Sequence, residues 1–213
     1  MKILQGTQAL ETRIMAANEF EFLDEAELVD FPGLMAVSQF VRMLGGVPWF
    51  GALGLQLDGR EELLAEDYLL ALGFPDARIS PITNWEEAAD AAANPEWNTD
   101  WWEAEEQARV ALVAEACMRA DEDTVMVALT HLQNQAVEAV LESVELAAEA
   151  AGIDDTELIR AAAGSAAQGI YQAGLLLAAQ NEDDEHHAFA LKYRLFESGR
   201  WPIGVVGNSF HIF

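Results

Sequence analysis

Apolar residues recur at intervals of three and four over most of the chain, which is the spacing that places them on one face of an α-helix. Capping side chains, glycines and prolines separate the periodic segments, and the segment between Pro75 and Pro81 is expected to be a loop. The pattern predicts helices over Gly33–Leu44, Glu61–Leu72, Trp85–Ala93, Asn98 or Thr99 to about Ala120, Asp123–Ala151, Asp155–Gln180, and from a turn at Asn181–Asp184 to about Ser198. Nearer the start, Thr7 can cap a helix whose apolar face runs from Leu10 to Met15.

The helix predicted from Asp155 to about Gln180 has almost no charge after Arg160. Its uncharged run, Ala161–Gln180, is as long as a membrane span, but it contains three glutamines, a serine and a tyrosine. We therefore expect a buried central helix. Small residues along it permit close approach of other helices: Ala163, Ala167, Gly169, Ala173 and Gly174.

The C-terminal segment has a different pattern. Two short apolar runs, Ile203–Val206 and Phe210–Phe213, flank a Gly-Asn-Ser turn, which is typical of a β-hairpin. A hairpin alone is marginally stable, and Met1–Leu4 could add a third strand. The sequence thus predicts a mainly α fold: one helical domain over residues 1–213, with a buried central helix at about 155–180 and a small C-terminal hairpin. A domain boundary near Pro81–Pro95 is the alternative.

Charge narrows the range of partners. The 213 residues include 37 Asp and Glu against 11 Lys and Arg, a formal net charge of −26. This balance argues against direct binding to nucleic-acid phosphates or to anionic membranes, and it favours a basic partner. The predicted helix Asp123–Ala151 presents four glutamates on one face, which we call the acidic stripe: Glu138, Glu142, Glu145 and Glu149.

Positive charge gathers only near the C terminus. There Lys192, Arg194 and Arg200 face a single acid, Glu197, after residue 186. These cations can stabilise the end of the last helix, pair with the acidic body, or form an anion or partner site.

Tryptophans are concentrated between residues 85 and 102. Trp85, Trp97, Trp101 and Trp102 alternate with acids there, as in PEWNTDWWEAEE. One interpretation is a set of core residues that fasten short helices; the other is a contact surface for a basic partner or a cationic ligand. Neighbours in a helix point roughly 100° apart, so Trp101 and Trp102 can both be buried only where elements meet. Trp97, Trp101, Trp102 and the acidic stripe are the candidate partner-binding residues.

The candidate metal ligands are Asp183, His186 and His187. Asp183 and His186 have the three-residue spacing that would place a carboxylate and an imidazole on one helix face. Carboxylate-bridged dimetal bundles need such a pair on two helices, and a second pair is missing because Ala128 precedes His131 by three residues. An acid-rich helix start is the simpler explanation. No cofactor is expected, although a divalent metal at this cluster stays open.

Signatures of other chemistry are absent from the sequence. It contains no GxGxxG, GxxxxGK[ST], HExxH or GxSxG pattern, and no catalytic residues can be assigned. The single cysteine, Cys117, lies in an apolar helix segment and is expected to be a structural thiol rather than a nucleophile. It cannot form an intrachain disulfide, and the first residues do not form a signal peptide, so we expect a cytoplasmic protein.

Three functions are consistent with these patterns. The favoured one is a non-enzymatic protein-binding module, such as an inhibitor, an immunity-type protein or a charge mimic acting on a basic partner. The alternatives are a salt-adapted protein of unknown activity and a metal-dependent enzyme with a carboxylate and histidine site. Self-assembly through Ala161–Gln180 is a further possibility, and no pattern sets the oligomeric state.

Overall fold

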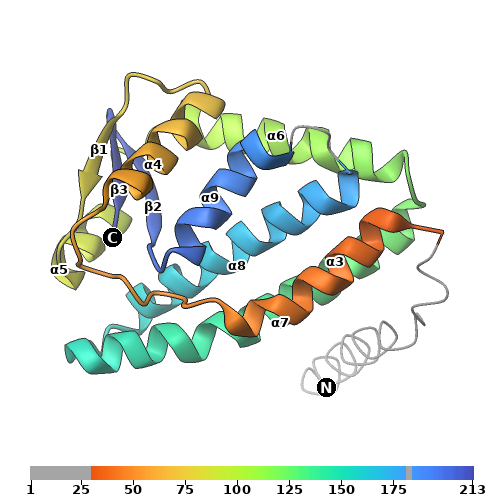
Figure 1. The fold of residues 1–213 in the computed structure, drawn as a ribbon. Helices are drawn as coiled ribbons and strands as arrows, with labels where there is room; N and C mark the ends of the chain where they lie inside the picture. The colour runs from red at the N-terminus through yellow and green to blue at the C-terminus, as the bar shows by residue number, and fades with distance from the viewer. Residues whose placement is uncertain (1–29, 181–183) are drawn as a thin grey trace, which may run out of the picture.

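The computed structural model describes residues 30–180 and 184–213 (Figure 1). The predictions on Met1–Leu4, Thr7 and Asp183 lie outside these ranges. The described helices are α3 (Pro32–Met43), η2 (Leu44–Gly46), α4 (Gly59–Ala71), α5 (Trp85–Ala92), α6 (Thr99–Cys117), α7 (Glu122–Ala151), α8 (Thr156–Ala179), η3 (Asp184–His186) and α9 (Ala188–Glu197). The strands are β1 (Arg78–Pro81), β2 (Pro202–Val206) and β3 (Ser209–Ile212). The predicted mainly α fold with a small C-terminal hairpin is confirmed.

Helix α8 is the centre of the helical layer, as its low charge predicts. It packs against α3, α6, α7 and α9, and most of its residues are buried (Figure 1). Close packing depends on its small residues: a Cβ at Gly174 would collide with Leu132 of α7, and one at Gly169 would lie 2.8 Å from Phe196 of α9. None of the helices in the described ranges combines the length and the hydropathy that a membrane span requires.

The three strands form a sheet at one end of the helices, in the order β1-β3-β2 (Figure 1). β2 and β3 are antiparallel, as the hairpin pattern predicts, whereas β1 runs parallel to β3 with Ile79 opposite Phe210. The expectation of a loop from Pro75 to Pro81 is therefore wrong for its second half. Four residues ending in a proline have too weak a pattern to indicate a strand, and here pairing with β3 forms it.

Two of the three C-terminal cations are buried in ion pairs. Arg200 is 3% exposed and forms a two-pronged pair with Glu61 at 2.8 and 2.9 Å. Its remaining donors bind the carbonyl oxygens of Ala52, Leu55 and Gln56, so one guanidinium holds the loop before α4. Burial alone would raise the Glu61 pKa, but hydrogen bonds from Arg200 and from the Asp58 N–H bring it below its ordinary value.

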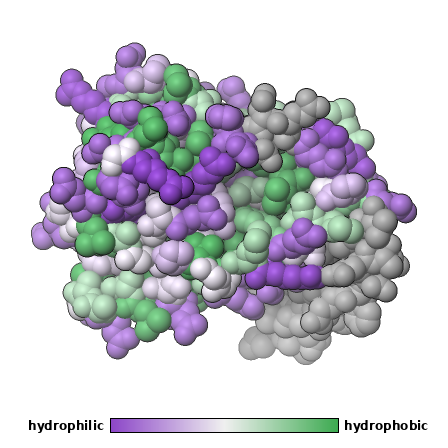
Figure 2. Space-filling model, in the orientation of Figure 1, coloured by the Kyte–Doolittle hydropathy of each residue, from purple (hydrophilic) through white to green (hydrophobic). Residues whose placement is uncertain are grey.

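The exposed surface mixes polar side chains with small hydrophobic groups. Figure 2 shows one face, on which hydrophobic residues emerge among polar ones over α4, where Leu63 and Leu70 are exposed. On the opposite side of the molecule lies the site described next.

Candidate functional site

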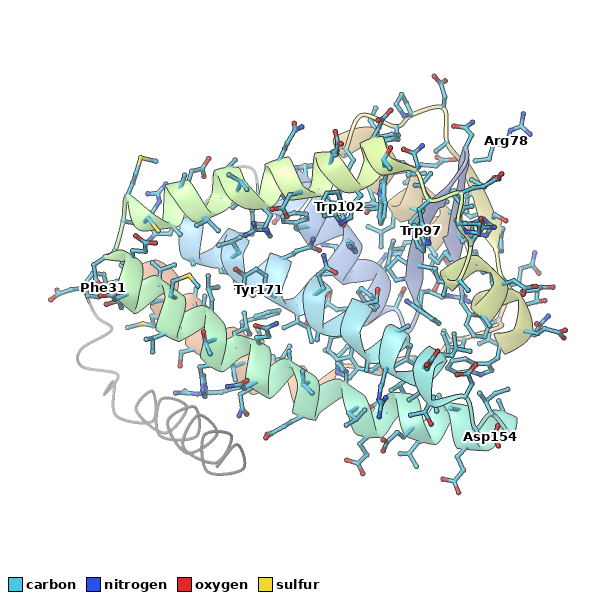
Figure 3. The ribbon with its side chains drawn as sticks, turned by 180° about the vertical axis from the view of Figure 1, so that it is seen from behind. Phe31, Arg78, Trp97, Trp102, Asp154 and Tyr171 are labelled. Atoms are coloured by element: carbon cyan, nitrogen blue, oxygen red, sulfur yellow. The ribbon has the colours of Figure 1, made fainter. Side chains whose placement is uncertain are left out.

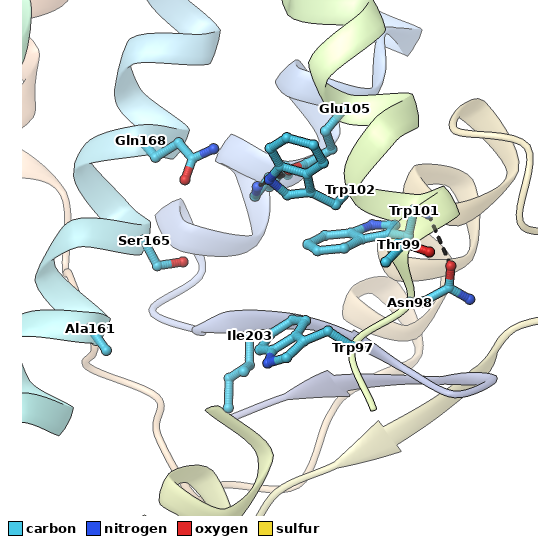
Figure 4. Close-up of a pocket in the computed structure, with 11 residues that line it drawn as sticks. Trp97, Asn98, Thr99, Trp101, Trp102, Glu105, Ala161, Ser165, Gln168 and Ile203 are labelled. Carbon is cyan, nitrogen blue, oxygen red and sulfur yellow. Dashed lines mark hydrogen bonds and ion pairs between the residues drawn. The ribbon is translucent and has the colours of Figure 1, made fainter. Parts of the chain in front are cut away.

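Three of the clustered tryptophans meet at the start of α6. Trp101 is buried, with 6% of its surface exposed, whereas the ring of Trp102 is 60% exposed and Trp97 is partly buried. Figure 4 shows Trp97 and Trp101 on one side of a hollow, with Trp102 at the next position of α6. Trp85 lies apart from them and packs on Trp201 and Phe213 in the core. The core interpretation is therefore confirmed for Trp85 and Trp101, whereas a contact surface at the exposed Trp102 stays a prediction.

Asn98 fixes the start of α6. Its side-chain oxygen accepts a hydrogen bond from the Trp101 N–H at 3.0 Å, so it is the N-cap that starts the helix. Its backbone N–H donates to Val205 at 2.9 Å, and Trp97 forms a bridge with Val206. The end of β2 thus holds the residues before α6, and the cap directs Trp101 and Trp102 along the first turn.

A glycine in β2 makes room for two of the indole rings. Gly204 has a φ of +144°, and a Cβ there would collide with Trp97 and lie 2.9 Å from Cη2 of Trp101. The rings of Trp97 and Trp101 stack with 6.1 Å between centroids and 25° between planes. A side chain at residue 204 would therefore displace both rings.

A buried network of hydrogen bonds supports Trp101 from behind. Its indole N–H donates to the Tyr68 hydroxyl at 3.1 Å, and that hydroxyl donates to Glu105 at 2.8 Å. Lys192 of α9 completes the network with Nζ 2.7 and 3.0 Å from the two Glu105 oxygens. The same Nζ lies 5.7 Å from the centroid of the Trp101 ring, within cation–π range. Burial, followed by the negative charge of Glu105, raises the pKa of Tyr68, which keeps this hydroxyl protonated.

The hollow in front of the tryptophans has a volume of about 430 Å³. Its far side belongs to α8, where the Ser165 hydroxyl points into it and the Gln168 amide faces Trp102 (Figure 4). Ile203 of β2 closes one end. The lining thus combines indole rings with a few neutral polar groups, a composition typical of binding sites.

Ionisable groups are few in the lining of the hollow. Among the described lining residues, Glu105 and Lys192 are the titratable groups, and they neutralise each other at 2.7 Å. Ser165 contributes a hydroxyl to the lining, beside the Gln168 amide. The arrangement can present aromatic surface, a hydroxyl and an amide to a bound molecule.

The acidic stripe is separate from this hollow. Its four glutamates are exposed on α7, and none of them lines the tryptophan hollow. The structure thus brings together Trp97, Trp101 and Trp102 but not the tryptophans and the stripe.

The histidines of the candidate metal cluster do not share a helix face. His186 ends η3 and is exposed, and His187 is the N-cap of α9, so the expected helix from Asn181–Asp184 begins later than predicted. Nδ1 of His187 accepts a hydrogen bond from the Phe189 N–H at 3.1 Å, and burial lowers the pKa of its ring. In residues 30–180 and 184–213 no three His, Cys, Asp or Glu side chains converge as metal ligands.

Sequence reasoning missed the residues that complete the hollow. Ser165 and Gln168 are isolated polar residues in an apolar helix, and Glu105 and Lys192 lie 87 residues apart. One available signal was Gly204, because a glycine within a strand often marks close approach of another group. The spacing of Ala161, Gly164 and Gln168 by three and then four residues gave no indication that α6 leaves this face of α8 open.

Comparison with known proteins identifies no relative: no family model, no curated protein and no solved structure matches this chain.

Proposed function

We propose that this protein is a non-catalytic binding module that recognises a basic partner protein through the tryptophan hollow. The observation that carries the proposal is Trp102, whose large ring is 60% exposed at a hollow already lined by Trp97 and Trp101. Tryptophan is enriched among the residues that dominate interface energies, and an exposed ring beside a concave site gives a partner apolar area to bury.

Unpaired acids around the hollow support a basic partner. Glu96, Asp100 and Glu103 are exposed in the segment that carries the tryptophans, and none of them forms an ion pair in the described part of the chain. A lysine or arginine that approaches Trp102 meets both a ring face and these carboxylates. The net charge of −26 attracts such a partner over a longer distance.

The structure also supports a preformed site. Trp101 is held by Tyr68, and the backbone before α6 is held by β2. A site that is rigid before binding loses little conformational entropy when the partner arrives. The proposal includes action in the cytoplasm, supported by a single free thiol at Cys117, and on protein rather than on nucleic acid.

Affinity capture with matched baits tests the proposal. Wild-type protein and the variant Trp102→Ala are immobilised, exposed to a lysate of the organism that encodes the protein at physiological salt, and washed at high salt. We expect a basic protein that the wild type retains, that high salt releases, and that Trp102→Ala fails to retain. Equal retention of every captured protein by both baits would contradict the proposal.

A further inference from the structure

The tryptophan hollow continues along α8 beyond Gln168. A second hollow of about 550 Å³ begins at the same glutamine and is lined by Gly164 and Tyr171 of α8, Arg109 of α6 and Val137 of α7. Figure 3 shows why: α6 and α7 diverge, and α8 with Tyr171 lies between them. The two hollows form one groove, which we call the α8 groove, with α8 as its floor and α6 and α7 as its walls.

The charged side chains that line the α8 groove are paired, whereas two exposed acids next to lining residues are not paired in the described part of the chain. Lys192 pairs with Glu105 in the first hollow, and Arg109 forms a two-pronged pair with Glu106 at 2.6 and 2.8 Å in the second. Glu103 follows Trp102 and Glu138 follows Val137 in the sequence; both acids are exposed and make no ion pair in the described residues. A neutral centre with a charged rim is the usual anatomy of a protein interface.

The walls and the floor favour a helical occupant. An extended peptide gains affinity by pairing with a free strand edge, and helices form the walls of this groove. A helix satisfies its own backbone hydrogen bonds and requires only a complementary surface. The floor allows close approach, since Ala161 and Gly164 are exposed and a Cβ at Gly164 would meet nothing within 4 Å.

We propose that the α8 groove binds a basic amphipathic α-helix of the partner. Apolar residues at positions i, i+3, i+4 and i+7 of that helix pack on Trp102, Val137 and the floor of the groove. Lysines and arginines on its flanks meet Glu103 and Glu138 at the rims. This inference rests on the proposed function and specifies which kind of segment the partner supplies.

Two synthetic peptides of identical composition test the helical occupant. Both are 18-residue peptides of leucine, lysine and alanine; one places leucine at helical spacing, and the other alternates leucine and lysine as a strand would. Binding at physiological salt is followed by tryptophan fluorescence and calorimetry. The variants are Gly164→Phe, which fills the floor, and Gln168→Arg, which adds a like charge where the two hollows join. Ala114→Phe is the matched control on an exposed position of α6 that lines neither hollow.

We expect the helical peptide to bind wild type and Ala114→Phe equally, and to lose affinity by about tenfold or more in Gly164→Phe and in Gln168→Arg. Far-ultraviolet circular dichroism verifies that each variant is folded. If Gly164→Phe does not fold, the affinity of Gln168→Arg for the helical peptide still tests the inference. Equal affinity for the two peptides, or unchanged affinity in both groove variants, would overturn the inference. Loss of binding in Trp102→Ala with unchanged binding in both groove variants would overturn the helical occupant while leaving the proposed function intact. The bait comparison above tests that function separately.

Discussion

Lys192 Nζ lies 2.7 Å from Glu105 Oε1, which joins α9 to α6 behind the tryptophan hollow. Both residues are 4% exposed, and both make further contacts: Glu105 accepts a hydrogen bond from the Tyr68 hydroxyl, and Lys192 lies over the Trp101 ring. The pair therefore helps to fix the position of α6 relative to α9, and with it the position of the tryptophans that line the hollow.

Removal of one partner of this pair should be strongly destabilising. In Lys192→Met, Glu105 would be a buried carboxylate with only the Tyr68 hydroxyl as a hydrogen-bond donor among the side chains described, and such losses typically cost about 3–5 kcal/mol. Urea unfolding measures the change in free energy. The double variant Lys192→Met/Glu105→Leu should recover much of that loss because no charge remains buried. A single variant as stable as the wild type would contradict this description of the pair.

The two-pronged ion pair between Arg200 and Glu61 predicts that the wild type and a Glu61 variant differ in stability by an amount that depends on pH. The Glu61 pKa in the fold lies below its ordinary value of 4.5, so the ionised pair stabilises the protein fully above that value. This contribution is lost as the pH falls through the lowered pKa. We expect Glu61→Gln to unfold at lower urea concentration than the wild type at pH 7, and this difference should narrow as the pH falls below 4.5. A stability difference between the wild type and Glu61→Gln that stays constant with pH would show that the charge on Glu61 does not contribute to it.

Two glycines of α8 should respond in opposite directions to the same substitution. Gly174→Ala places a methyl group against Leu132 and should cost about 1–3 kcal/mol through overpacking. Gly164→Ala places it in open space on an exposed turn and should stabilise the helix by about 0.5–1 kcal/mol. Thermal unfolding of Gly174→Ala and Gly164→Ala tests both predictions. Equal effects would contradict the packing of α7 on α8.

Alanine substitutions at Trp101 and Trp102 should have different effects on the stability of the fold. Trp101→Ala removes a buried ring that donates to Tyr68, and it should cost about 3–5 kcal/mol of unfolding free energy. Trp102→Ala removes a mostly exposed ring and should change stability by about 0.5 kcal/mol or less. Chemical unfolding of the two variants under identical conditions measures both values. Comparable losses would mean that Trp102 is a core residue, which would remove the basis of the proposed function.

The sequence predicts the helical framework because local patterns determine it. The spacing of Val125, Leu129 and Leu132 requires a helix with one buried face, and the low charge of residues 161–180 requires that helix to lie in the middle. Capping residues place several helix starts within one or two positions. The turn between β2 and β3 is equally local, since glycine and asparagine favour it.

Long-range pairing explains what the sequence did not predict. β1 forms because Arg78–Pro81 lies against β3, 131 residues later at Arg78 and Ser209, and no local pattern indicates that pairing. The sequence left open whether Lys192 and Arg200 pair with acids, because their partners Glu105 and Glu61 are distant in sequence. The candidate site also depends on long-range packing. The clustered tryptophans can be recognised in the sequence, whereas Gln168 belongs to the site only because α8 packs beside α6.

In the proposed function, Trp102 is the principal contact for a basic partner. Dissociation constants of the captured partner for the wild type, for Trp102→Ala and for a quadruple variant with glutamine at all four positions of the acidic stripe test it most directly. We expect about a thirtyfold loss of affinity for Trp102→Ala, mainly through faster dissociation, and for the quadruple variant slower association with weaker salt dependence. An unchanged dissociation constant for Trp102→Ala would contradict the account.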